Sequence, residues 1–265
     1  MTIQDQTLYQ GDILREWQVV EGGSVDLILT DPPYGSITRG QPWDLRPDFH
    51  ALAWIFDQIL KREGQIVSFC DFQTSWEINL GFGRYFDYRF SWVWRKPSAL
   101  PSNSTRPAND LEYVLVYKRK KTKTRDVTFN LNELKTAGEP YAKRGGKSQN
   151  KNPTRGNGGS MPDLFENEDG QRFPRSILHF PNKPCMKKIE RTGHPTQKPV
   201  DMLDYILRGL SNPGDTILDP FVGSGSTLVA CHRTGRKGIG FELHGEYFEM
   251  AKARLERETA QGVLL

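Results

Sequence analysis

The chain of 265 residues is poor in cysteine and has no long hydrophobic run. Its three cysteines are far apart, which argues against a disulfide framework or a clustered metal site and favours a reducing, cytoplasmic setting. No stretch approaches the roughly 20 apolar residues of a transmembrane helix, and residues 1–11 lack the apolar core of a signal peptide. We therefore expect no membrane partner and no bound metal. The length fits one large domain that carries an insertion.

Positive charge is concentrated in one part of the chain. Residues 118–190 hold 17 lysines and arginines against 8 aspartates and glutamates, a net charge of +9, whereas the remainder has a net charge of −5. Within this block, residues 136–163 are rich in Gly, Pro, Asn, Lys and Ser and show no helical or strand period, which predicts loops. A basic block on an acidic remainder favours a polyanionic partner, although a solvated basic surface has the same composition.

Predicted strands and helices alternate on both sides of this block. Apolar runs predict strands at 25–30, 65–69, 88–94, 112–117, 216–219 and 237–242. Helical spacing of apolar residues predicts helices over 47–62, with a stop near Gly64, and over 200–210, and the last third of the chain predicts two more, ending near 233 and 258. The alternation predicts an α/β fold, a Rossmann-like, mostly parallel sheet with helices on both faces.

A glycine-rich turn follows the predicted strand at 216–219, where residues 219–225 read DPFVGSG. Gly223 and Gly225 would let the backbone approach a ligand closely, and Glu242, at the end of the next strand, could accept hydrogen bonds from ribose hydroxyls. The turn matches neither GxGxxG nor GxxxxGK[ST], and the acidic Asp219 disfavours a pyrophosphate. These features favour a cationic nucleoside cofactor such as S-adenosylmethionine, although a glycine turn also serves plain strand-to-helix packing.

A second motif, DPPY at residues 31–34, follows the predicted strand at 25–30. Ligands of open α/β sheets bind beyond the carboxyl ends of the strands. Asp31 and the Pro32 carbonyl could together accept two hydrogens from an exocyclic amine, and Tyr34 offers a face on which a base can stack. The alternative is a proline-rich strand exit with an incidental Asp and Tyr.

These motifs, in this order, resemble those of the β class of S-adenosylmethionine-dependent DNA amino-methyltransferases. DPPY resembles the catalytic motif of that family, and residues 219–225 resemble its cofactor loop. His194–Pro199, which reads HPTQKP, resembles the segment that packs around the methionine moiety, and Asp12 stands where the family's Asp approaches the cofactor adenine. The resemblance covers most of residues 7–117 and 191–258, and the intervening block falls where the family has its variable target-recognition region.

The resemblance implies three parts in permuted motif order: a catalytic part at 1–117, a target-recognition insertion at 118–190 and a cofactor-binding part at 191–265. The implied catalytic residues are Asp31, Pro32, Pro33 and Tyr34. The implied cofactor-binding residues are Asp12, Thr196, Lys198, Asp219, Phe221, Gly223, Ser224, Gly225, Thr227 and Glu242. Within the insertion, the candidate DNA phosphate contacts are Lys143, Arg144 and Lys147.

The function that the resemblance implies is transfer of a methyl group from S-adenosylmethionine to adenine N6 in duplex DNA, after the base is flipped out of the helix. Residues 35–44 are a candidate mobile loop over the site, and Trp43 fits either that loop or the core. Asp31 favours adenine, because the family uses Ser more often for cytosine N4, which is the nearest alternative. A non-catalytic DNA-binding regulator, methylation of protein glutamine and an RNA substrate also stay open. Expected partners are double-stranded DNA, a cognate restriction endonuclease and a second copy of the chain.

Overall fold

The computed structural model describes residues 1–35, 44–99, 107–136, 141–144, 164–167 and 170–260, of which 141–144 and 164–167 are described by their backbone. The chain divides into two compact units. The first unit combines Met1–Asn130 with Arg175–Leu265, and the second is Leu131–Pro174. The second unit is therefore shorter than the predicted insertion at 118–190, whose two ends belong to the first unit.

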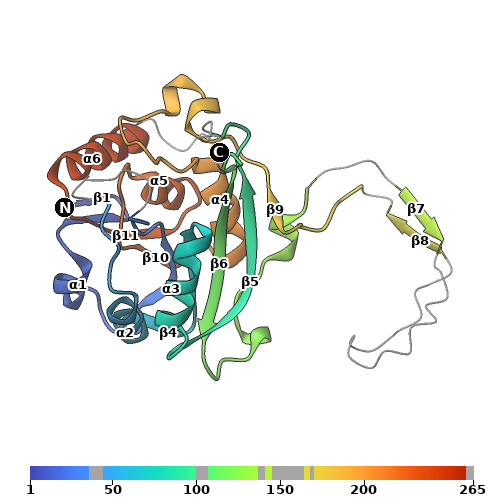
Figure 1. Ribbon diagram of the computed structural model, residues 1–265, viewed down its shortest axis with the longest axis horizontal. Helices are drawn as coiled ribbons and strands as arrows, with labels where there is room; N and C mark the ends of the chain where they lie inside the picture. The colour runs from blue at the N-terminus through green and yellow to red at the C-terminus, as the bar shows by residue number, and fades with distance from the viewer. Residues whose placement is uncertain (36–43, 100–106, 137–140, 145–163, 168–169, 261–265) are drawn as a thin grey trace. The chain divides into compact units, whose positions relative to one another are not determined.

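The first unit is built on a sheet whose strand order is β1-β2-β11-β10-β3-β4-β6-β5-β9 (Figure 1). Neighbouring strands are parallel from β2 to β4 and between β5 and β9, whereas β1 with β2, β4 with β6 and β6 with β5 are antiparallel. The sheet is thus mostly parallel, as expected from the alternating pattern. The strands are β1 (Thr2–Ile3), β2 (Gln6–Gln10), β3 (Val25–Thr30), β4 (Leu60–Cys70), β5 (Phe86–Arg95), β6 (Leu111–Arg119), β9 (Ile177–Leu178), β10 (Thr216–Asp219) and β11 (Lys237–Glu242).

Helices cover both faces of this sheet. Helices α1 to α3 share one buried cluster with the sheet. Helix α4 contacts α5, α5 contacts α6, and α5 and α6 pack on β2 and β11. No helix of the described residues combines the length and the apolar composition needed to cross a membrane. The α-helices are α1 (Ile13–Glu16), α2 (Phe49–Ile59), α3 (Phe72–Phe82), α4 (Val200–Leu210), α5 (Ser226–Arg233) and α6 (Gly245–Ala260). Short 3-10 helices are η1 (Trp17–Val19), η2 (Thr124–Asp126), η4 (Lys183–Cys185) and η5 (Lys188–Glu190).

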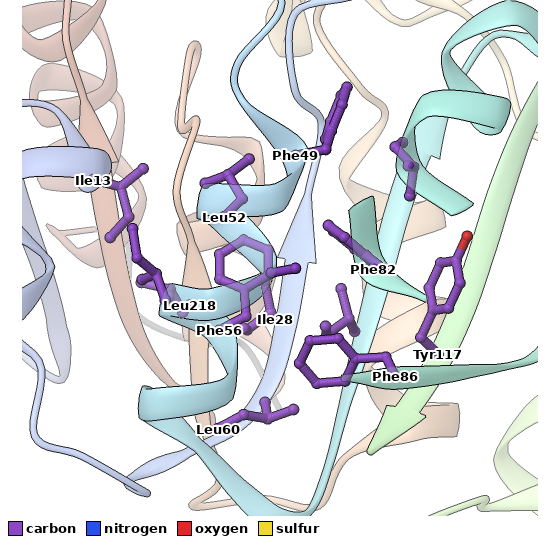
Figure 2. Packing of buried hydrophobic residues seen from close by; sticks show 14 of the residues in the cluster. Ile13, Ile28, Phe49, Leu52, Phe56, Leu60, Phe82, Phe86, Tyr117 and Leu218 are labelled. Carbon is purple, nitrogen blue, oxygen red and sulfur yellow. The ribbon is translucent and has the colours of Figure 1, made fainter. Parts of the chain in front are cut away.

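Aromatic rings pack together with aliphatic side chains in the core between α2, α3 and the sheet (Figure 2). The ring of Phe82 on α3 packs edge-on against Phe56, Phe86 and Tyr117, with centroid distances of 5.8, 6.0 and 5.3 Å. All four side chains are at most 2% exposed. Burial of each such side chain contributes about 1.5–3 kcal/mol. This packing fixes α2 and α3 against the strands that lead to the functional edge of the sheet.

The predicted elements of the α/β part match the observed ones, except around Gly64. The helix predicted over 47–62 begins after its cap, Asp48, and ends at Ile59, and β4 starts at once. Gly64 lies inside β4 and does not end the helix. A Cβ atom placed on Gly64 would lie 2.6 Å from the Leu60 side chain, so glycine serves close packing there. Helix α3 was not predicted, because apolar residues on both its exposed and its buried face obscure the helical period. The exposed ones are Phe72, Trp76 and Leu80.

The second unit contains η3 (Leu131–Leu134) and a two-stranded antiparallel sheet of β7 (Tyr141–Arg144) and β8 (Leu164–Asn167). A further antiparallel bridge joins Thr136 to Arg172. The prediction of loops throughout residues 136–163 is therefore wrong at 141–144. Lys143 and Arg144 lie on β7, whereas Lys147 lies outside the described residues.

Candidate active site

The carboxyl ends of β2, β3, β10 and β11 meet at one edge of the sheet, because the four strands are parallel neighbours. A pocket with a cavity volume of about 240 Å³ lies at this edge. The segments that follow the four strands line it, together with the segment from His194 to Lys198. The structure thus brings the DPPY motif and the glycine turn, nearly 190 residues apart in the chain, to a single cavity.

The glycine turn forms one wall of this pocket. Gly223 and Gly225 have φ angles of +52° and +79°, a region that disfavours side chains. A Cβ atom on Gly223 would lie 3.0 Å from Nε2 of His194. The amide of Gly223 donates to Glu242 Oε2 at 2.7 Å, and the amide of His244 donates to Glu242 Oε1 at 2.9 Å. Glu242 therefore ties the turn to the end of β11.

Two buried carboxylates face the pocket from this wall. Asp219 is 3% exposed and accepts the Phe221 amide at 3.0 Å, and burial raises its pKa to about 7. Burial also raises the pKa of Glu242, against the opposing effect of its backbone donors. Neither carboxylate forms an ion pair with another described residue. This wall of the pocket is suited to a ligand that carries positive charge.

Nine of the ten predicted cofactor residues line the pocket. The exception is Gly225, which stands at the N-cap of α5. Asp12 caps α1 by accepting the Leu14 amide at 2.9 Å, and a salt bridge of 3.7 Å joins it to Arg15. The assignment of these ten residues to a cofactor site remains a prediction.

A second wall of the pocket carries the DPPY motif, where Asp31 follows β3, the neighbour of β10. The Tyr34 hydroxyl lies 2.8 Å from Asp31 Oδ1 and 2.8 Å from Glu112 Oε1. The Lys198 ammonium lies 2.5 Å from Asp31 Oδ2 and 2.8 Å from Glu112 Oε1, and the Lys96 ammonium lies 2.7 Å from Glu112 Oε2. We refer to Asp31, Tyr34, Lys96, Glu112 and Lys198 as the charge cluster.

Burial raises the pKa values of the two carboxyl groups in the charge cluster, and the Lys198 ammonium opposes this effect. Burial and the nearby Glu112 raise the pKa of Asp31, and Lys198 opposes them. Burial would also raise the pKa of Glu112, but Lys198 and Lys96 outweigh it and lower that pKa to about 2. Burial and the two carboxylates raise the pKa of Tyr34, so its hydroxyl keeps its proton. The cluster thus pairs two carboxyl groups with two ammonium groups.

The positions of Tyr34 and Lys198 add detail that the sequence did not provide. The Tyr34 ring is 4% exposed, and its hydroxyl is engaged with the two carboxylates, so its role in stacking a base stays a prediction. Lys198, predicted to contact a cofactor, lines the pocket but directs its ammonium to Asp31 and Glu112. Most of the predicted loop at 35–44, including Trp43, lies outside the described residues.

Sequence reasoning missed Glu112 and Lys96. Neither belongs to a motif, and each stands where a predicted strand begins or ends. The one signal in the sequence was a carboxylate at the start of the apolar run 112–117. The sequence also did not show that His194 packs on Tyr247 in the pocket lining, where the two ring centroids are 4.4 Å apart. Burial, with help from Lys198 and Lys183, lowers the pKa of His194 to about 4, so the ring is neutral at pH 7.

Comparison with known proteins identifies the family. Residues 25–253 match the model of the N6/N4 DNA methylases, which spans well over half of the chain. The chain belongs to this DNA methylase family. The match includes the DPPY motif, the charge cluster and the glycine turn, and it confirms the resemblance drawn from the two motifs.

Similar curated proteins carry methyltransferase names. The DNA adenine methyltransferase YhdJ of Escherichia coli strain K12 is 29% identical over 259 residues, which cover 95% of this chain and 83% of that protein. The type II methyltransferase M.HpaI of Haemophilus parainfluenzae is 28% identical over 265 residues, which cover 96% of this chain and 75% of that protein. Both matches extend over the catalytic motif, the basic block and the cofactor loop.

Solved structures share the fold of the DNA methylase. The complex of M1.HpyAVI with S-adenosylmethionine has a TM-score of 0.61 and 26% identity, over 94% of this chain and all of that chain. The cytosine-N4-specific PvuII DNA methyltransferase has a TM-score of 0.66 and 18% identity, over 98% of this chain and 92% of that chain. At 18% identity, the second likeness shows the fold alone.

Proposed function

We propose that this DNA methylase transfers a methyl group from S-adenosylmethionine to N6 of adenine in duplex DNA, with the target base flipped into the pocket. One observation carries the proposal. A single cavity is lined in one part by Asp219 and Glu242, buried carboxylates suited to a cationic donor, and in another by Asp31, a carboxylate able to accept a hydrogen from an amine. The relative M1.HpyAVI was solved with S-adenosylmethionine, which supports this donor.

The residues of the first wall fit the proposed donor. Glu242 is held at the end of β11, where a carboxylate accepts hydrogen bonds from ribose hydroxyls. The buried Asp219 offers negative charge toward the sulfonium and ammonium groups of the donor. Gly223 leaves the space that a side chain would fill beside His194. When bound, S-adenosylmethionine supplies an electrophilic methyl group on a positively charged sulfur.

The residues of the second wall activate the acceptor. An exocyclic amine is a weak nucleophile, because its lone pair is delocalised into the ring. Asp31 and the Pro32 carbonyl accept the two amine hydrogens and so favour a tetrahedral nitrogen whose lone pair points to the methyl group. A nitrogen–carbon bond forms as the sulfur–carbon bond breaks, and that electron pair stays on sulfur. Asp31, whose pKa is raised, accepts the proton that the methylated nitrogen then loses.

Adenine is preferred over cytosine for two reasons. The motif carries Asp31 where cytosine-N4 enzymes of the family more often have Ser, and the similar E. coli protein is named an adenine methyltransferase. The experiment incubates the enzyme and labelled S-adenosylmethionine with unmethylated genomic DNA, and then identifies the labelled nucleosides. N6-methyldeoxyadenosine supports the proposal. N4-methyldeoxycytidine would assign the enzyme to cytosine, and absence of label from the DNA would overturn the proposed reaction.

We further propose that residues 118–190 recognise the target sequence, with Lys143, Arg144 and Lys147 contacting phosphates. Such contacts release counterions, so DNA affinity should fall steeply with salt. Changing the three residues to Ala should make the plot of log DNA affinity against log salt concentration less steep, by roughly 0.9 for each phosphate that is no longer neutralised. The affinity for the cofactor should stay unchanged. An unchanged slope would assign them to a solvated surface. A cognate endonuclease and a second copy of the chain are the other proposed partners, as the resemblance of the motifs to those of the family implies.

A further inference from the structure

Glu112 connects the two donors that contact Asp31. It stands at the start of β6, which is antiparallel to β4, so it reaches the same edge of the sheet as Asp31. Its side chain is 6% exposed, and its Oε1 lies 2.8 Å from both the Tyr34 hydroxyl and the Lys198 ammonium. Those same two groups contact Asp31 at 2.8 and 2.5 Å. Asp31 and Glu112 therefore share the three hydrogens of the Lys198 ammonium and compete for the single hydrogen of the Tyr34 hydroxyl.

The hydroxyl of Tyr34 carries a single hydrogen and donates to one carboxylate at a time. It lies at an equal distance from Asp31 Oδ1 and Glu112 Oε1. When the hydrogen points to Glu112, Oδ1 is free to accept a hydrogen from another donor. Without Glu112, both the hydroxyl and the ammonium of Lys198 would turn to Asp31 and occupy the oxygens that an amine must reach.

The negative charge of Glu112 supports the function of Asp31, as the position of Glu112 does. Glu112 and Asp31 together balance Lys96 and Lys198, so loss of the Glu112 charge would leave the cluster with one excess positive charge. Excess positive charge makes Asp31 a weaker proton acceptor. The ionisable groups that face Asp31 are Tyr34, Cys70, Glu112, Lys198 and Asp219, with Lys96 behind Glu112.

We infer that Glu112 is a positioning residue for methyl transfer. It draws the Tyr34 hydroxyl and one N–H of Lys198 away from Asp31, so that Asp31 can accept the target amine. Lys96 holds Glu112 in place from the other oxygen, outside the contact with Asp31. The inference rests on the proposed function and goes beyond it, because it gives a role to a residue outside both motifs.

The test measures single-turnover methyl transfer to DNA over a range of pH. Glu112→Gln should lower the rate constant at least about tenfold, because misplaced reacting groups are costly, and should leave S-adenosylmethionine affinity within about twofold. The acidic limb of the pH–rate profile of Glu112→Gln should move to lower pH, because the pKa of Asp31 falls when a negative neighbour is lost. Lys96→Met should move the acidic limb to higher pH, since a positive neighbour is lost. A purely structural role predicts no such opposed shifts.

Asp87→Asn is the matched control, because Asp87 on β5 pairs with Lys118 on β6 at 3.0 Å, away from the pocket. It should leave the rate and the pH profile unchanged. Glu112→Asp keeps the charge and should restore part of the rate. If Glu112→Gln does not fold, Glu112→Asp and Lys96→Met are the variants that test the inference. A wild-type rate and profile in Glu112→Gln, or shifts in the same direction, would overturn the inference. If the wild-type enzyme labels no DNA at all, the proposed function fails instead.

Discussion

Lys198→Met tests whether the charge cluster is held together by its charges. The Lys198 ammonium lies 2.5 Å from Asp31 Oδ2 and 2.8 Å from Glu112 Oε1, and its side chain is 9% exposed. Methionine keeps much of the length and the apolar stem but removes the ammonium. Two buried carboxylates would then share one site, with only Lys96 beside them. The variant therefore isolates the electrostatic contribution of a single group.

The expected loss is large because the ion pairs are buried. Removal of one partner from a buried pair costs about 3–5 kcal/mol, since it leaves a buried charge without compensation. An exposed pair contributes about 0–1 kcal/mol. Lys61 and Asp26, at 2.7 Å and with side chains 44% and 21% exposed, provide the exposed counterpart within the same sheet. Lys61→Met should therefore cost less than about 1 kcal/mol in the free energy of unfolding.

The sign of the pH dependence follows from the shifted pKa values. The pKa of Lys198 is raised by its two carboxylate partners, so its contribution is fully present below its ordinary value of 10.5 and is lost as the pH rises through the raised value. The pKa of Glu112 is lowered to about 2. Its contribution is present above its ordinary value of 4.5 and is lost as the pH falls through about 2. Between about pH 5 and 9 the contributions of Lys198 and Glu112 to stability are therefore fully present.

Lys198→Met should be more destabilised at pH 8 than at pH 5. Without Lys198, the pKa of Asp31 rises further, and uptake of a proton at lower pH relieves the repulsion from Glu112. Urea denaturation of the wild type, Lys198→Met and Lys61→Met at both pH values measures the difference. Equal losses of less than about 1 kcal/mol in the two variants would refute the reasoning. Calorimetry with S-adenosylmethionine on folded Lys198→Met then separates a role in the cluster from direct contact with the cofactor.

Three further predictions address other parts of the molecule. Asp31→Ala should abolish methyl transfer in a tritium-transfer assay yet bind S-adenosylmethionine normally by calorimetry, because Asp31 is assigned to the target amine. Glu242→Gln should weaken that binding roughly tenfold or more, since a charged acceptor is lost, and unchanged affinity would remove Glu242 from the ribose site. Asp204→Asn on α4 should stabilise the fold by about 1–3 kcal/mol at pH 8 in thermal melts, because burial raises the pKa of Asp204 to about 7. That gain should shrink as the pH falls below about 7 and disappear well below the ordinary pKa of 3.8, where the carboxyl is protonated in both states.

Much of the sheet could be predicted because its strands are short apolar runs with clear ends. Two prolines after Asp31 end β3, and the charged Glu242 ends β11. Helix α3 escaped prediction because a sequence does not say which of its apolar residues face water. The strand at 141–144 escaped prediction because its partner, β8, follows about twenty residues later, and cross-strand pairing is a tertiary property.

The residues of the candidate site also fall into two groups, those that the sequence predicts and those that it does not. Residues in contiguous motifs, such as Asp31 and Gly223, could be found because backbone chemistry fixes their spacing. Glu112 and Lys96 could not, because antiparallel pairing of β5 with β6 and of β6 with β4 brings them to Lys198 and Asp31. Nothing in the local sequence of Glu112 distinguishes it from a solvated carboxylate at a strand end. Its partners appear only when β6 is placed beside β4.

The distribution of charge across the pocket matches the course of the proposed reaction. The donor wall has two buried carboxylates without ion-pair partners among the described residues, Asp219 and Glu242, and a cationic donor would supply the missing positive charge. The acceptor wall is already neutral, because its two carboxylates face two ammonium groups. Before transfer, we therefore expect positive charge to be favoured on the donor side and a neutral base on the other. Transfer moves that positive charge to the nitrogen beside Asp31. Asp31, whose pKa is raised, accepts a proton from that nitrogen, and the acceptor side returns to its starting charge when this proton leaves to solvent.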